Sequence, residues 1–133
     1  MTDNGLTSIA SAHSVAETIE RLVAAITPLG MNVFARIDHA AGAAKVGMPL
    51  RPTQLLLFGN PKGGTPLMQD KQTAGIDLPL KALAWEDADG KVWLSYNETS
   101  WIAQRHGLGA ASAAAVTAIA AGLEKVTKAA ATK

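Results

Sequence analysis

The chain has 133 residues, of which 48% are hydrophobic and 17% are charged, a composition typical of one globular domain. Its 12 basic and 11 acidic residues are scattered along the chain, so no basic stripe follows a phosphate backbone and we expect no nucleic acid partner. Cysteine is absent, which excludes disulfides, thiolate nucleophiles and cysteine-ligated metal.

The sequence predicts neither export nor a membrane span. Residues 1–5 carry an acidic residue where a signal peptide has a basic one, and no apolar segment follows. The uncharged run 107–123 approaches the length of a span, but most of it is alanine or glycine, and its large apolar residues fall on one helical stripe. We therefore expect a cytoplasmic protein with no membrane partner.

The first half of the chain predicts two strands and a helix. Weak alternation favours a short strand over 6–11, and clean alternation favours a half-buried strand over 32–38. Between them, Ser14 and Glu17 form a capping-box pattern that begins an amphipathic helix, which is expected to end near Pro28. The small residues 40–45 are compatible with one or two further helical turns.

The second half predicts three strands and three helices around a glycine-rich loop. A buried strand over 53–58 leads into the loop, after which Thr65 is the expected N-cap of a short surface helix. Two strands, 81–87 and 91–97, form a hairpin through an Asp-Gly turn. A short helix over 101–106 and a long one over about 110–128 complete the chain.

These elements predict an α+β fold in which one antiparallel sheet has helices packed on one face, in β-α-β4-α order with short extra helices. We expect a single domain over residues 6–128, with residues 1–5 and 129–133 frayed.

Several motifs resemble the bacterial and archaeal family called domain of unknown function 302. The similarity spans about residues 15–108, and its most specific block is the sequence from Pro52 to Met68. The other matching motifs are Asp38-His39, Asp77-Leu-Pro-Leu-Lys81, Trp85-Glu-Asp and Arg105-His106. The resemblance implies a TATA-binding-protein-like arrangement of the sheet and helices, and dimers, but no established activity.

The glycine-rich loop is the best candidate for a binding site. Its lysine precedes the glycines, whereas a Walker loop has Gly-Lys-Ser/Thr opening a long helix, so a nucleotide triphosphatase is rejected. Backbone N–H groups and one lysine would still converge on a small volume that suits a carboxylate or phosphate. The alternative is a tight loop whose glycines merely allow the turn. The candidate ligand-binding residues are Asn60, Lys62, Gly63, Gly64 and Thr65.

Asp38 and His39 are the candidate catalytic pair, because a carboxylate beside an imidazole can orient it and raise its basicity. Adjacent strand residues point to opposite faces, so the pair cooperates only if the chain turns at His39; otherwise His39 has a capping or core role. Asp77 is interpreted as a turn-forming or capping residue. The three histidines lack metal-ligand spacing, so no metal site or cofactor is predicted.

The leading functional hypothesis is a homodimeric domain that binds a small anionic or amphipathic molecule near the glycine-rich loop. One alternative is an enzyme with His39 and Asp38 as general base and Lys62 with loop amides stabilising an anion. Another is a structural or regulatory interaction module without a ligand. A dimer would pair through sheet edges or through the alanine-rich C-terminal helix.

Overall fold

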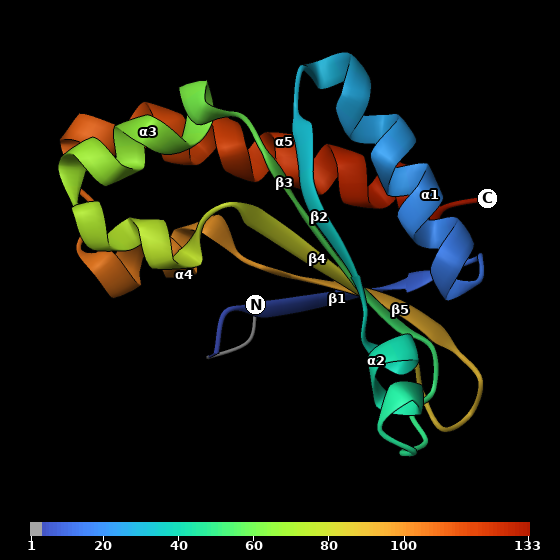
Figure 1. The fold of residues 1–133 in the computed structure, drawn as a ribbon. Coiled ribbons are helices and arrows are strands. Elements are labelled where there is room, and N and C mark those ends of the chain that lie inside the picture. The colour runs from blue at the N-terminus through green and yellow to red at the C-terminus, as the bar shows by residue number, and fades with distance from the viewer. Residues whose placement is uncertain (1–3) are drawn as a thin grey trace.

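A computed structural model describes residues 4–133. Its centre is one antiparallel sheet of five strands in the order β1-β5-β4-β3-β2, which confirms the predicted α+β fold. Helices α1, α3 and α5 gather together in the upper half of the view in Figure 1. The strands are β1 (Leu6–Ser11), β2 (Asn32–Asp38), β3 (Thr53–Gly59), β4 (Leu80–Glu86) and β5 (Val92–Asn97). The α-helices are α1 (Val15–Ile26), α2 (His39–Lys45), α3 (Pro61–Asp70), α4 (Thr99–His106) and α5 (Ala113–Ala131).

Helix α1 begins where the capping pattern predicts. The hydroxyl of Ser14 accepts a hydrogen bond from the backbone N–H of Glu17 at 3.1 Å. The helix ends in a short 3-10 turn, η1 (Thr27–Leu29), closed by Gly30 in the left-handed region at φ +75°. Its buried face carries Ile19, Leu22 and Ile26, all fully inaccessible to solvent, so α1 forms one wall of the core.

Helix α5 lies beside α1 over the same face of the sheet and is longer than predicted. We expected the chain to fray from residue 129, but α5 continues to Ala131, and Ala130 and Ala131 are buried. The guanidinium of Arg21 on α1 donates to the carbonyl oxygens of Ala129, Ala130 and Thr132. These bonds satisfy carbonyls that a helix end otherwise leaves unpaired. Residues 1–3 of the predicted N-terminal fray lie outside the described part of the chain.

The sheet buries the alternate residues that face these helices. In β3, Leu56 and Phe58 are fully buried, and Ala82, Ala84 and Leu94 continue the same layer across β4 and β5. The predicted hairpin is confirmed, with Gly90 at φ +80° in its turn. The layer of side chains between the sheet, α1 and α5 is the hydrophobic core.

Helix α3 begins earlier than the sequence suggested. Its N-cap is Asn60, whose side chain accepts a hydrogen bond from the N–H of Lys62 at 2.9 Å, and Pro61 is the first helical residue. The predicted cap, Thr65, and the following Pro66 lie inside the helix. The glycine-rich stretch is therefore the first turn of a helix and not an open loop.

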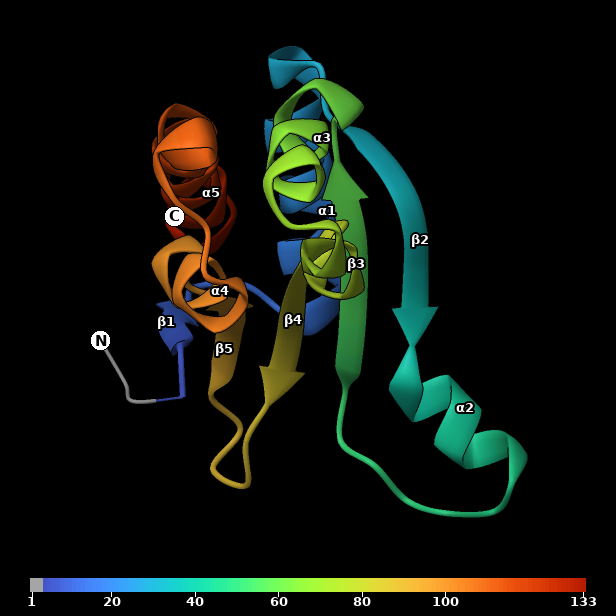
Figure 2. The ribbon, with the colours of Figure 1, turned by 90° about the vertical axis from the view of Figure 1, so that its left-hand side faces the viewer.

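Helix α2 and the chain after it project away from the rest of the molecule (Figure 2). Asp38 caps α2 by accepting from the N–H of Ala41 at 2.9 Å. The helix has no buried residue, and every residue from 44 to 52 is exposed. This segment connects β2, at one edge of the sheet, to β3.

Candidate functional site

A largely apolar cavity of about 500 Å³ lies where α3 and α5 meet the end of the sheet. The side chains of Phe34, Leu80 and Ile119 contribute to its walls, and few polar atoms reach it. The complete lining consists of Met31, Phe34, Gly59, Asn60, Pro61, Gly63, Gly64, Thr65, Met68, Gly75, Leu78, Pro79, Leu80, Ala118, Ile119 and Gly122.

Glycines give this cavity its width. A Cβ atom at Gly63 would lie 3.7 Å from Ile119, and one at Gly64 would lie 3.4 Å from Leu78, both in contact with the opposite wall. At Gly122, in the middle of α5, a Cβ would meet no atom within 4 Å. Larger residues at these positions would occupy space that the cavity now holds.

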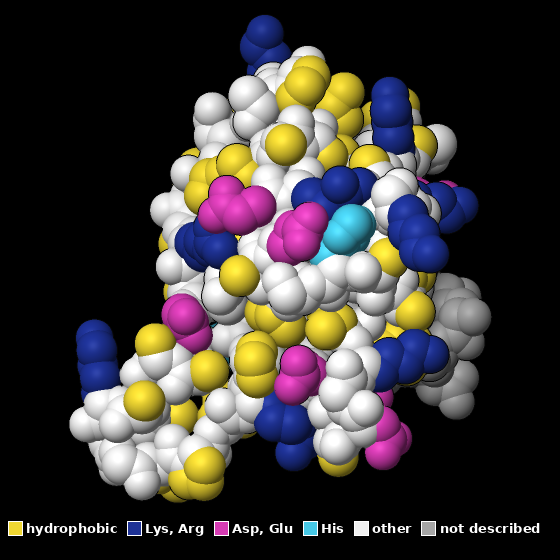
Figure 3. All heavy atoms as spheres, turned by 90° about the vertical axis from the view of Figure 1, so that its right-hand side faces the viewer, with side chains coloured by type: hydrophobic (Ala, Val, Ile, Leu, Met, Phe, Trp, Pro, Cys, Tyr) yellow, Lys and Arg dark blue, Asp and Glu magenta, His cyan; other side chains and the backbone are white. Residues whose placement is uncertain are grey.

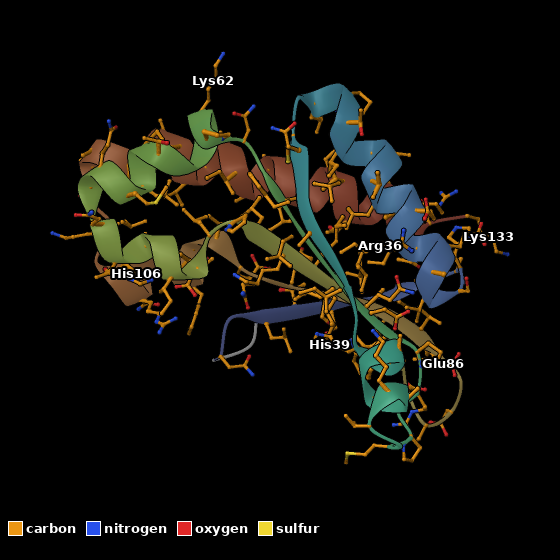
Figure 4. All side chains as sticks on the ribbon, in the orientation of Figure 1. Arg36, His39, Lys62, Glu86, His106 and Lys133 are labelled. Carbon is orange, nitrogen blue, oxygen red and sulfur yellow. The ribbon has the colours of Figure 1, made fainter. Side chains whose placement is uncertain are left out.

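We expected the loop amides to help hold an anion, and in the structure they donate at the start of α3. The N–H groups of Gly63 and Gly64 donate to the carbonyl oxygen of Asn60 at 2.9 and 3.1 Å, and that of Lys62 donates to the Asn60 side chain. These donors are committed to the start of α3. The side chain of Lys62 points away from the ribbon (Figure 4), and Lys62 is not among the residues that line the cavity. Asn60, Gly63, Gly64 and Thr65 do line it.

Asp38 and His39 lie at the other end of the sheet. Strand register pairs Asn32 with Gly59, next to α3, and pairs Asp38 with Gln54 six residues further along. That length of strand separates the two ends by about 20 Å. Figure 4 shows His39 and Lys62 far apart, so the arrangement does not bring a His39 base and a Lys62 cation to one substrate. Asp38 caps α2, and His39 is the exposed first residue of that helix.

A polar cluster that we did not predict from the sequence joins Asp77 to α4. The Asp77 carboxylate accepts from Arg105 at 3.0 Å and lies 2.6 Å from Nε2 of His106, whose Nδ1 is 3.0 Å from the hydroxyl of Thr73. The side chains of His106 and Asp77 are 7% and 12% exposed. The cluster ties the 3-10 segment η2 (Gln72–Asp77) to α4. The sequence separation of 29 residues hides this contact from local patterns, although Asp77, Arg105 and His106 all stand in the family motifs.

The described residues 4–133 contain no helix long and apolar enough to cross a membrane. They also contain no group of three or more histidine, aspartate or glutamate side chains placed to hold a metal ion.

The sheet, its helices and the glycine-lined cavity define a small α+β domain. Comparisons with known proteins identify the family of this domain. The model of the domain of unknown function DUF302 matches residues 7–130, so the chain belongs to this family. A solved structure described as an uncharacterized conserved protein DUF302 from Bacillus stearothermophilus has a TM-score of 0.75. It is 20% identical, and the match covers 96% of this chain and 95% of that one, which supports the fold alone.

Curated relatives are more similar in sequence. The chain is 57% identical over 126 residues to "Fluoride-specific ion channel FluC 1" of Brucella suis biovar 1 (strain 1330). It has the same identity to "Fluoride-specific ion channel FluC 2" of Brucella melitensis biotype 1. Each match covers 95% of this chain, but 50% and 47% of the respective relatives. The chain thus spans about half the length of the curated relatives it matches.

These names correct the functional predictions made from the sequence. We predicted a cytoplasmic domain without a membrane partner that binds a small anionic or amphipathic molecule near the glycine-rich loop. This prediction is wrong, because the relatives are named as ion channels. The same finding overturns the His39 enzyme, and a ligand-free module unconnected with a channel, as accounts of function. Composition and periodicity describe only the residues present, so they carry no information about the further sequence of these longer relatives.

Proposed function

We propose that this chain is a domain that operates together with a fluoride-specific ion channel and adjusts its fluoride transport. The observation that carries the proposal is the 57% identity, over 95% of this chain, to proteins named as such channels. Since the match covers half of those proteins, they have further sequence in which a pore can reside. We assign ion passage to that other half.

The geometry of the domain supports this division of labour. Fluoride is a small, strongly hydrated anion, and moving it without water requires hydrogen-bond donors that replace its hydration shell. The clustered amides at Lys62, Gly63 and Gly64 already donate within α3, and the cavity beside them is lined mainly by apolar atoms. A contribution through contact with the channel fits these features better than ion coordination by the domain.

Fluoride release from vesicles tests the proposal. The Brucella suis relative would be reconstituted intact and with the half that matches this chain deleted, and release would be followed with a fluoride electrode. We expect the deletion to change the rate about fivefold, the effect of about 1 kcal/mol of coupling, and this chain added separately to reverse part of the change. A heat-denatured sample of this chain is the control. Equal rates for intact and deleted protein would refute the proposal.

The roles of the predicted site residues in such a domain remain predictions. Lys62 and His39 are both exposed and stand at opposite ends of the sheet, so each is available to a separate partner surface.

A further inference from the structure

Exposed hydrophobic side chains are concentrated on one segment of the chain. Of the nine large hydrophobic residues that are exposed in the described part, six lie between residues 33 and 50. Single exposed hydrophobic residues are normal on protein surfaces, whereas a cluster marks an interaction site. The three at the end of the segment are Val46, Met48 and Leu50, which are 70%, 63% and 50% exposed.

These three side chains belong to a projecting tip, residues 44–52, in which every residue is exposed. In Figure 3, hydrophobic side chains gather on the knob at the lower left, which α2 and this tip form, with a basic side chain at its outer edge. The tip is convex and stands clear of the helices that cover the sheet (Figure 2). A convex apolar tip suits a deformable surface better than the flat face of a folded partner.

Both charged residues of the tip are basic. Lys45 and Arg51 flank the three hydrophobic residues, and the sequence contains no acidic residue between Asp38 and Asp70. Asp38 itself caps α2, and Arg51 is anchored through its Nε to the carbonyl oxygen of Glu86 at 3.2 Å. Glu86 is the acidic residue that this contact brings to the base of the tip. Apolar side chains between basic residues are the pattern that binds the interface of an anionic bilayer.

We propose that the tip at residues 44–52 inserts Val46, Met48 and Leu50 into the headgroup region of an anionic lipid bilayer, with Lys45 and Arg51 against the phosphates. A second copy of this chain is disfavoured as the occupant, because two tips brought together would oppose Lys45 and Arg51 of both copies. The inference is independent of the channel proposal, since it concerns lipid alone.

Vesicle sedimentation tests the inference with the purified chain. Vesicles of phosphatidylcholine with phosphatidylglycerol should sediment the wild type more strongly than vesicles of phosphatidylcholine alone. The double variant Met48→Ser/Leu50→Ser should bind both vesicle types about tenfold more weakly, because it buries less apolar area in the bilayer. Lys45→Gln should lose about fivefold on the anionic vesicles only.

A matched control separates the tip from general hydrophobicity. Ile76→Ser replaces a residue that is 71% exposed but lies on η2, outside the tip, and should bind like the wild type. All variants alter exposed residues, so we expect them to fold like the wild type. Their unfolding temperatures will check this. Wild type that remains in solution with both vesicle types, or a double variant that sediments like the wild type, would overturn the inference. A wild type that binds neither vesicle type but self-associates through the tip would also overturn the inference.

Discussion

Asp87 is a single carboxylate that organises the β4–β5 hairpin. One of its oxygens accepts from the N–H groups of Asp89 and Lys91, and the other accepts from the indole N–H of Trp93, all at 2.9 Å. The Trp93 bond is the main reason that the pKa of Asp87 lies below its ordinary value of 3.8, and the Lys91 backbone bond adds to it. Hydrogen bonds of this kind favour the ionised form.

The lowered pKa predicts how Asp87 affects stability with pH. Because the folded pKa is depressed, the stabilisation is complete above the unfolded value and is lost as pH falls through the folded pKa, below 3.8. Asp87→Asn should therefore lower the melting temperature at pH 7, and its difference from the wild type should shrink as the pH falls below 3.8. Asp89→Asn, on the same turn, is the control. A constant difference across pH would contradict the assignment.

The start of α3 depends on Asn60, whose side chain does two things at once. Its oxygen caps the helix at Lys62, and its amide nitrogen donates to the carbonyl oxygen of Gly30 at 3.0 Å, which joins α3 to the end of α1. Asn60→Ala should cost about 1 kcal/mol in the free energy of unfolding, measured by chemical denaturation.

Thr65 provides the matched comparison for this element. It lies inside α3, so Thr65→Ala removes no N-cap and should change stability by less than Asn60→Ala does. A larger loss at Thr65 than at Asn60 would mean that the helix begins where the sequence alone suggested.

The misplaced helix start shows where local patterns fall short. Asn60-Pro61 and Thr65-Pro66 are both a capping residue followed by proline, and such a signal is equally valid at either place. Tertiary packing favours the earlier start, since Leu67 is buried and Gly63 faces Ile119 on α5. The capped helix α1, the strand at 32–38 and the hairpin were predictable because their signals are strong and unique. The Asp77–His106 contact was not, because it depends on how η2 and α4 meet.

The function was harder to predict from the sequence than the fold. The predicted site residues fall in two groups at opposite ends of the sheet, a separation that becomes visible once the register of β2 and β3 is known. The proposed connection to a membrane channel rests on relatives about twice as long as this chain, whose described residues contain no spanning helix.

At the scale of the whole molecule, two glycines in different backbone conformations predict opposite effects of substitution by alanine. Gly122 is inside α5 and a Cβ there meets no atom within 4 Å, so Gly122→Ala should stabilise the protein by about 1 kcal/mol. Gly107 ends α4 at φ +66°, where Gly107→Ala should destabilise it by about 1 kcal/mol. Thermal unfolding measures both changes in stability. A lower unfolding temperature for Gly122→Ala would contradict the conclusion that the space beside Gly122 in α5 is open.

The glycine-lined cavity also bears on how the molecule moves. One of its walls, α3, contains Gly63, Gly64 and the internal Pro66, which are poor helix formers, and Pro66 has no N–H to bond back along the helix. The opposite side of the core, α1, has an intact cap and three fully buried aliphatic side chains. We therefore expect local unfolding to require the least free energy at α3, the wall of the cavity. Such unfolding would open the cavity while α1 and the sheet keep their packing.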